Sequence, residues 1–254
     1  ANWDTPQTVT VTGADDSIID GTITSIATVA VDDANSDNDF DAVADQTVSV
    51  DTTDDDVAGF TIVELDGATE VDESGTTDTF TVVLDAQPSD NVVIAMSSSD
   101  IGEATISGTI SFTPANWDTP QTVTVTGLDE NTIDGDQTST ITITIVDSIS
   151  DSDFSNVADQ TVSVVTTDDD VAGFSIVELD GSTEVDESGT TDTFNVVLDA
   201  QPTSDVVLTI TSDDTGEATV NSPLTFTPAN WDTPQTVTVT GVDEDIVDGT
   251  ITST

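Results

Sequence analysis

Hydrophobic and polar residues alternate with a period of two along most of this chain. In residues 78–85, for example, Phe80, Val82 and Leu84 fall on one face of an extended backbone, with polar or β-branched residues between them. This alternation is typical of strands with one buried face, and no stretch shows a helical period. The pattern predicts an all-β chain.

Between residues 57 and 170 the same pattern predicts seven or eight short strands separated by turns, which is the signature of an antiparallel β-sandwich. The segment 114–120 has proline at both ends and is not expected to pair regularly; we expect its Trp117 to close one end of the core. The extended stretches are expected at 59–65, 69–73, 78–85, 91–98, 104–106, 110–113, 121–127, 138–146 and 160–167.

The chain is built from one repeated unit. The sequence Ala-Asn-Trp-Asp-Thr-Pro-Gln-Thr-Val-Thr-Val-Thr-Gly occurs at 1–13, 115–127 and 229–241, a spacing of 114 residues each time. A repeat of this length has the size of an independent domain and is longer than a solenoid repeat. We therefore expect a tandem array of β-sandwich modules with a 114-residue repeat.

Acidic triplets mark the expected joints between modules, because Asp54 to Asp56 and Asp168 to Asp170 are each followed by Val-Ala-Gly-Phe. This register predicts the C-terminal part of a module at 1–56, a complete module at 57–170 and the N-terminal part of the next module at 171–254. We expect a stretch of a longer repetitive protein, whose partial modules are completed by further sequence or by a neighbouring chain.

The charge balance is extreme, with 52 Asp and Glu residues and no Lys, Arg or His. This composition excludes nucleic acid as a partner, and no apolar run is long enough for a membrane-spanning helix. Like charges a few ångströms apart cost on the order of 1 kcal/mol per pair even in water. Specific divalent metal sites or high salt are the two ways to offset this repulsion.

Carboxylates concentrate at 70–73, at 129–136 and at the triplet 168–170. Calcium takes several hard oxygen ligands from a flexible loop, and Gly135 permits a tight turn in the second cluster. In a sandwich the loop and the triplet can lie at one end and share a metal. Aspartate also favours solvated turns, an alternative that we retain for Asp66 and Asp100.

The order of four motifs resembles the Calx-beta family: Val-Asp-Glu-Ser-Gly at 71–75, Thr-Phe-Thr-Val-Val-Leu at 79–84, Thr-Val-Thr-Val at 122–125 with its acidic loop, and the triplet at 168–170. The chain is most similar to Calx-beta-like tandem repeats of large bacterial extracellular adhesins and surface fibre proteins, and the resemblance covers the whole module. It implies an immunoglobulin-like sandwich that binds Ca2+ at one end.

The matching motifs imply a set of calcium ligands in three groups. They are the early glutamates Glu73 and Glu187; the loop residues Asp129, Glu130 and Asp134 with their copies Asp243, Glu244 and Asp248; and the triplets Asp54, Asp55, Asp56 and Asp168, Asp169, Asp170. Asp136 is replaced by Thr22 and Thr250 in the other copies, so we do not expect it to be essential. The loop with Asp151 and Asp153 receives no role from the resemblance.

Catalysis is not expected, because the chain has no His, Lys, Arg, Cys or Tyr to activate a nucleophile. Near-identical repeats favour the shaft of an extracellular fibre or giant adhesin on the cell surface, stiffened by calcium. Its expected partners are adjacent modules of the same or an identical chain, and a glycan or protein at an unseen tip.

Two alternatives remain. One is a carbohydrate- or protein-binding module, which exposed Trp3, Trp117 and Trp231 would favour. The other is an acidic, halophilic surface-layer protein without specific metal sites.

Overall fold

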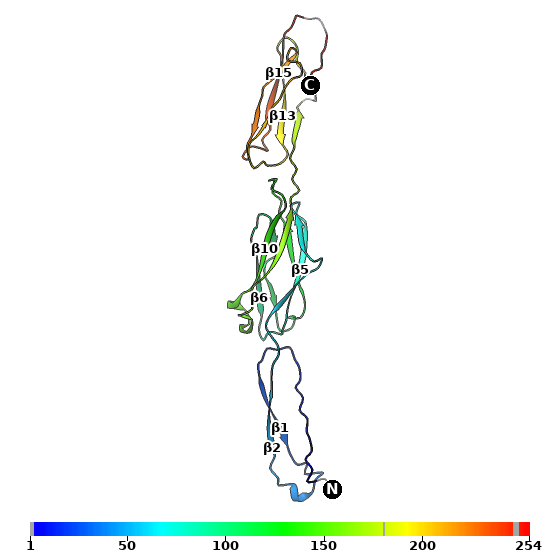
Figure 1. Ribbon diagram of the computed structural model, residues 1–254, viewed down its shortest axis with the longest axis vertical. Helices are drawn as coiled ribbons and strands as arrows, with labels where there is room; N and C mark the ends of the chain where they lie inside the picture. The colour runs from blue at the N-terminus through cyan, green and yellow to red at the C-terminus, as the bar shows by residue number, and fades with distance from the viewer. Residues whose placement is uncertain (1–2, 180, 246–248) are drawn as a thin grey trace.

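The computed structural model describes residues 3–179, 181–245 and 249–254. The chain is all-β, as predicted, and the described residues contain only three short 3-10 turns besides strands and loops. Figure 1 shows three portions of the chain following one another along a single long axis. The described part contains no helix with the length and apolar character needed to cross a membrane.

The central portion is a sandwich of two sheets. The first sheet has the order β3 (Phe60–Glu64), β5 (Thr77–Leu84), β9 (Gln121–Gly127) and β7 (Ala104–Ile106). The second sheet has the order β4 (Thr69–Asp72), β11 (Gln160–Thr167), β10 (Gln137–Ile145), β6 (Val92–Ser98) and β8 (Ile110–Phe112). Residues 57–170 thus hold nine strands rather than seven or eight, because the short piece β4 is a paired strand.

One strand pair departs from the antiparallel pattern. β4 runs parallel to β11, with Val71 opposite Thr166 and Asp72 opposite Thr167. The pairing continues one residue further, where the Glu73 N–H donates to the Thr167 carbonyl at 3.2 Å. Parallel pairing brings the C-terminal ends of both strands to the same edge, so Glu73 lies beside the Asp168 triplet.

The core lies between the two sheets. Phe80, Val82 and Leu84 are buried on one face of β5, as the alternation predicts. Trp117 packs against this core with its side chain half-buried, and its carbonyl accepts from the Leu84 N–H. The prediction that this tryptophan closes the core is confirmed.

The loop after β10 carries two of the 3-10 turns, η2 (Asp147–Ile149) and η3 (Ser152–Phe154). Phe154 is fully buried and anchors the loop to the core. The Asp151 carboxylate accepts from Ser89 N–H and Oγ–H, Asp90 N–H and Asp153 N–H. Asp151 therefore ties this loop to the turn before β6, a structural role that the sequence did not reveal.

The other portions repeat parts of this sandwich. The N-terminal portion pairs β1 (Ile23–Val29) with β2 (Gln46–Thr52), the counterparts of β10 and β11, and its loop holds η1 (Asn38–Phe40). The C-terminal portion has a four-stranded sheet of β12 (Phe174–Glu178), β13 (Thr191–Leu198), β17 (Gln235–Gly241) and β15 (Ala218–Val220). Its second sheet is the pair β14 (Val206–Leu208) and β16 (Leu224–Phe226).

Both joints are closed by the same backbone contact. Gln87 N–H donates to the Ser17 carbonyl at 2.7 Å, and 114 residues later Gln201 N–H donates to the Asn131 carbonyl at 2.6 Å. The acidic loop of the N-terminal portion and that of the central portion thereby each touch a turn of the portion that follows. Ile19 of the first acidic loop also packs against the central core.

Candidate metal centre

Glu73 is the key residue at the end of the central module that carries the acidic loop. Its side chain is 0 % exposed, and among the described residues neither of its carboxylate oxygens has a hydrogen-bond partner. A buried charge without a partner costs several kcal/mol. The sequence has no basic side chain that could supply a counter-charge, so any counter-charge comes from outside the chain.

A tight turn directs this side chain inward. Gly75 has φ +89°, and its N–H donates to the Asp72 carbonyl, which closes the turn after β4. The Asp72 carboxylate accepts from the N–H and the hydroxyl of Ser74. Glu73 is thus held between a paired strand and a capped turn, with its side chain on the core side.

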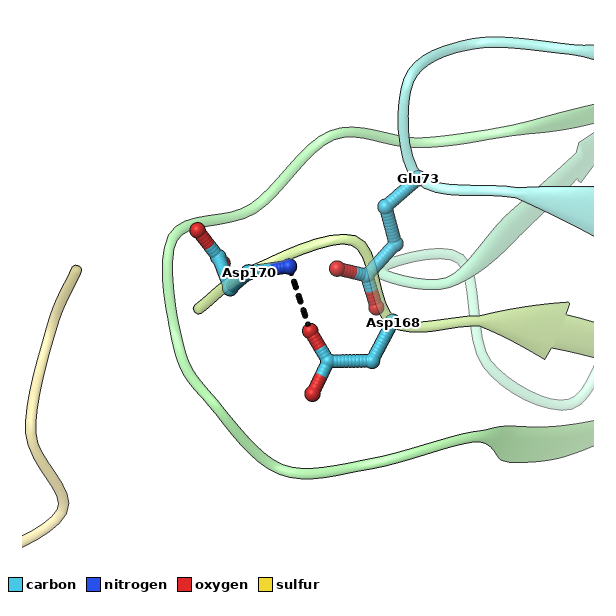
Figure 2. A group of neighbouring side chains, drawn as sticks. All are labelled: Glu73, Asp168 and Asp170. Atoms are coloured by element: carbon cyan, nitrogen blue, oxygen red, sulfur yellow. Dashed lines mark hydrogen bonds between the residues drawn. The ribbon is translucent and has the colours of Figure 1, made fainter. Parts of the chain in front are cut away.

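Four other carboxylates approach Glu73 in two groups. One group combines Glu73 with Asp168 and Asp170, and the other combines it with Glu130 and Asp134; within each group the ligand oxygens lie within 4.8 Å of one another. Figure 2 shows Glu73 and Asp168 side by side, with Asp170 further along the same joint segment. The prediction placed all five in the site, and the structure brings them together.

The electrostatics of the cluster are unfavourable for Glu73. Burial, followed by the negative charge of Asp168, raises the pKa of Glu73 to about 7. Burial and the charges of Asp168 and Asp169 likewise raise the pKa of Asp170, whose Oδ2 has no partner among the described residues. Among the residues that the structure describes, no donor stabilises the ionised form of either the Glu73 or the Asp170 carboxylate.

Asp168 behaves in the opposite way. Its carboxylate accepts from Gly135 N–H at 2.7 Å and Asp170 N–H at 2.9 Å. These backbone donors lower the pKa of Asp168. Gly135 has φ +76°, which agrees with the tight turn expected in the acidic loop.

Glu103 was missed by the sequence prediction. It precedes β7 and is 9 % exposed, and its Oε2 has no partner among the described residues. Burial and the nearby charge of Asp134 raise the pKa of Glu103. Glu103 stands in an Ile-Gly-Glu stretch and is not part of an acidic run. The sequence therefore provides no reason to include it, and it approaches the other carboxylates only in the folded chain.

Some predicted ligands lie outside the two groups. Asp129 and Asp169 are exposed and belong to neither group, although the charge of each contributes to the raised pKa of Asp170. Asp136, which the sequence comparison of the copies marked as dispensable, is also exposed and in neither group.

The first joint repeats part of this geometry. Asp54 accepts from Asp20 N–H, Gly21 N–H and Asp56 N–H, as Asp168 does from its counterparts. These backbone donors lower the pKa of Asp54, whereas burial and then the charge of Asp54 raise the pKa of Asp56. A cavity of about 240 Å3 is lined by the carboxylate-bearing residues Asp15, Asp16, Asp20, Asp54, Asp55 and Asp56.

In the C-terminal portion, Glu187 is half-buried beside Glu217 in a cavity of about 430 Å3. Of its predicted companions, Asp243 is exposed and Glu244 half-buried, while Asp248 lies outside the described residues. Among the described residues of this portion, the acidic side chains do not form a cluster like the two around Glu73.

No family model matches the chain, and no curated protein matches it. Similar solved structures include the Calx CBD1 domain in its apo form, with 17% identity over 45% of this chain and 100% of that one at a TM-score of 0.34. The CBD12 calcium-binding domain of CALX1.1 has 16% identity over 74% of this chain and 76% of that one, at 0.33.

Domains 1–6 of the surface layer protein SbsC match with 17% identity over 77% of this chain and 23% of that one, at a TM-score of 0.32. All three TM-scores lie below 0.5.

Proposed function

We propose that this chain is a structural repeat of an extracellular fibre or giant adhesin, a shaft on the cell surface that calcium stiffens at its joints. The role is structural and not catalytic. The observation that carries the proposal is the fully buried carboxylate of Glu73. Neither of its oxygens has a hydrogen-bond partner among the described residues, and it faces four further carboxylates in a chain without basic side chains.

The donor set fits calcium. Glu73, Asp168, Asp170, Glu130 and Asp134 would hold the ion, and Glu103 lies close enough to Asp134 and Glu130 for their charges to raise its pKa. All are hard oxygen donors, and calcium accepts about six to eight of them in a flexible geometry. Magnesium prefers fewer protein ligands and an octahedral shell. A bound divalent cation would supply the counter-charge that buried Glu73 lacks.

Calcium would act on the joint because four of its ligands lie on the two segments of the central module that reach the next portion. Glu130 and Asp134 belong to the loop that contacts Gln201 of the next portion through Asn131. Asp168 and Asp170 lie on the chain segment that leads into that portion. An ion that links loop and segment would restrict the joint, and a row of restricted joints makes a stiff shaft.

The packing of two of the three tryptophans favours a shaft over a sugar-binding module. Trp117 and Trp231 each pack against the core of their own portion, whereas Trp3, in the N-terminal portion, is 89 % exposed. Sugar sites use aromatic faces that are open to solvent, whereas the rings of Trp117 and Trp231 are partly buried against the core. The acidic surface-layer alternative differs from ours in having no specific ion site, so a test of ion specificity separates the two.

A thermal melt of the chain at fixed ionic strength tests the proposal. We expect calcium at about micromolar to millimolar concentrations to raise the midpoint of the central module saturably, with magnesium much less effective. The Glu73→Gln variant should melt higher than the parent chain in chelator, because a buried charge is removed, and should lose its calcium response.

The matched control is Glu70→Gln, which removes the same charge from an exposed side chain three residues away. It should leave the calcium response intact. A midpoint that follows total salt alone, or that calcium raises equally in both variants, would contradict the calcium shaft and favour a diffuse acidic surface.

A further inference from the structure

Asp-Gly pairs occupy two positions of the repeat. One position is the turn after β3, with Asp66-Gly67, and the other is the acidic loop, with Asp20-Gly21 and Asp134-Gly135. The pairs at 180–181 and 248–249 each include a residue outside the described ranges. Aspartate isomerises most readily before glycine, because glycine has no Cβ to hinder attack by its own backbone nitrogen.

The isomerisation needs an accessible carboxyl group and an unrestrained amide nitrogen. The glycine nitrogen attacks the side-chain carboxyl carbon of the preceding aspartic acid, and a water molecule leaves as a five-membered succinimide ring closes. Water then adds to one of the two ring carbonyls. Addition at the side-chain carbonyl restores aspartate, whereas addition at the main-chain carbonyl gives isoaspartate, in which the backbone runs through the former side chain.

In the two acidic loops the glycine nitrogen is held by a carboxylate. Gly135 N–H donates to Asp168 at 2.7 Å, and Gly21 N–H donates to Asp54 at 2.7 Å. A hydrogen bond to an ionised acceptor is roughly twice as strong as one between neutral groups. Ring closure would have to break this bond before the nitrogen could turn toward the preceding side chain.

The pair Asp66-Gly67 has no such restraint. Both residues are exposed, and among the described residues no side chain accepts from Gly67 N–H and no donor reaches the Asp66 carboxylate. Gly67 has φ +84°, and a Cβ added to it would meet nothing within 4 Å. The turn is therefore open to solvent, and no packing opposes the movement that closes the ring.

We infer that Asp66 is a site of spontaneous isomerisation, and that the carboxylates of Asp168 and Asp54 protect the Asp-Gly pairs of the acidic loops from the same reaction. Water is the only reactant besides the chain. The inference does not depend on a bound metal ion, so it is independent of the calcium role proposed above.

Isoaspartate at position 66 would change the entry into β4. It lengthens the backbone of the turn by one carbon atom, just before the buried Thr69 that begins the strand. The Thr69 hydroxyl donates to the Glu64 carboxylate at 3.3 Å across this turn. The modification would thus act on the strand that holds Glu73 in place, whereas protection of Asp134 preserves a candidate ligand.

The test incubates the full chain in chelator at mildly acidic pH and maps isoaspartate over time. The chain has no Lys or Arg for trypsin, so the digestion uses a protease that cleaves before aspartate and does not cleave before isoaspartate. We expect missed cleavage before Asp66 to accumulate several-fold faster than before Asp134 or Asp20. Equal rates at the three pairs would overturn the inference.

Two asparagine variants follow the same ring closure through a change of mass. Asp66→Asn and Asp134→Asn each lose ammonia on ring closure, and the deamidated peptide is resolved by mass spectrometry. Deamidation should be several-fold faster in Asp66→Asn. Adding Asp168→Ala to Asp134→Asn releases Gly135 N–H and should bring the two rates close together.

The matched control for that double variant is Asp136→Ala in the Asp134→Asn background. Asp136 is exposed and lies in the same loop, but its removal leaves the bond from Gly135 to Asp168 in place, so deamidation should stay slow. Equal acceleration by Asp136→Ala, or none by Asp168→Ala, would show that this bond does not protect the pair.

Denaturant separates the fold from the local sequence. In concentrated urea the hydrogen bonds of the loops are lost, so Asp66, Asp134 and Asp20 should isomerise at similar rates. A difference that persisted in urea would assign the selectivity to neighbouring residues and overturn the protective role of Asp168 and Asp54.

Discussion

The backbone N–H of Gly135 donates a hydrogen bond of 2.7 Å to the Asp168 carboxylate. This bond fastens the acidic loop to the segment that leaves the module, before any ion is considered. The same bond joins Gly21 to Asp54 at 2.7 Å in the first joint. Asp168 therefore has two tasks, as a hydrogen-bond acceptor and as a candidate ligand, whereas Asp170 has only the second.

This difference predicts opposite effects of two substitutions in chelator. Asp168→Ala should lower the melting midpoint, because the N–H groups of Gly135 and Asp170 lose their acceptor. Asp170→Ala should raise it, because the pKa of Asp170 shows that its ionised form is disfavoured in the fold. Thermal melts with and without calcium check both predictions. The melting midpoint of each variant should rise less with calcium than that of the parent. If both variants melted below the parent in chelator, Asp168 and Asp170 would not differ in the way proposed.

The pKa of Glu73 predicts how the metal-free protein depends on pH. The value is raised from 4.5 to about 7, so the folded state holds this proton more tightly than the unfolded state does. The resulting stability is present near pH 5 and is lost as the pH rises through about 7. The free energy of unfolding in chelator should thus be larger near pH 5 than above pH 7.

Glu73→Gln provides the control for that pH series, because it removes the titrating group and leaves the other acidic residues in place. Its pH dependence should be visibly flatter than that of the parent chain in urea titrations. In the parent, calcium affinity should fall below pH 7, since protons and metal compete for the same carboxylate. An unchanged slope in the variant would assign the pH effect to the general acidic load.

A glycine at the end of β9 predicts a sharp steric effect. A Cβ at Gly127 would collide with the backbone carbonyl oxygen of Asp72, which cannot move without disturbing the turn that holds Glu73. Gly127→Ala should therefore destabilise the central module by about 1–3 kcal/mol and weaken the calcium response. Gly108→Ala, where a Cβ would meet nothing within 4 Å, should change neither in the same melts.

The phenylalanine of the η3 loop predicts a cavity effect. Phe154→Ala should cost the central module about 3–5 kcal/mol, because the ring is fully buried. Phe40→Ala changes the corresponding, exposed ring of the N-terminal portion and should cost far less in dilute, low-salt solution. Denaturant titrations of the two variants make the comparison, and similar losses would show that the first portion already has a packed core.

The strands could be predicted almost to the residue because each has one buried face and a strict alternation, as in β5 with Phe80, Val82 and Leu84. The parallel pairing of β4 with β11 could not be predicted, because a four-residue strand carries too little pattern to specify its neighbour. That pairing places Glu73 next to Asp168. The geometry of the candidate site therefore depends on a strand pairing that the sequence pattern does not indicate.

The acidic clusters were recognisable from the sequence alone, but the sequence did not show which of their carboxylates lie next to Glu73 in the fold. Glu130 and Asp134 join Glu73 whereas Asp129, which precedes Glu130 in the same loop, faces solvent. Glu103 reaches the centre from another loop. Which carboxylates converge depends on how each loop crosses the end of the sandwich, and this is decided by packing and by backbone hydrogen bonds.

The position of β11 has a mechanical consequence. The strand leads directly into the joint, and it is held laterally by seven register positions against β10 and four against β4. A pull along the chain would load these ladders in shear, so that many bonds share the force instead of breaking one after another. Because β4 ends beside the same joint, an ion shared by Glu73 and Asp168 would clamp the loaded end, and resistance to tension would rise with calcium.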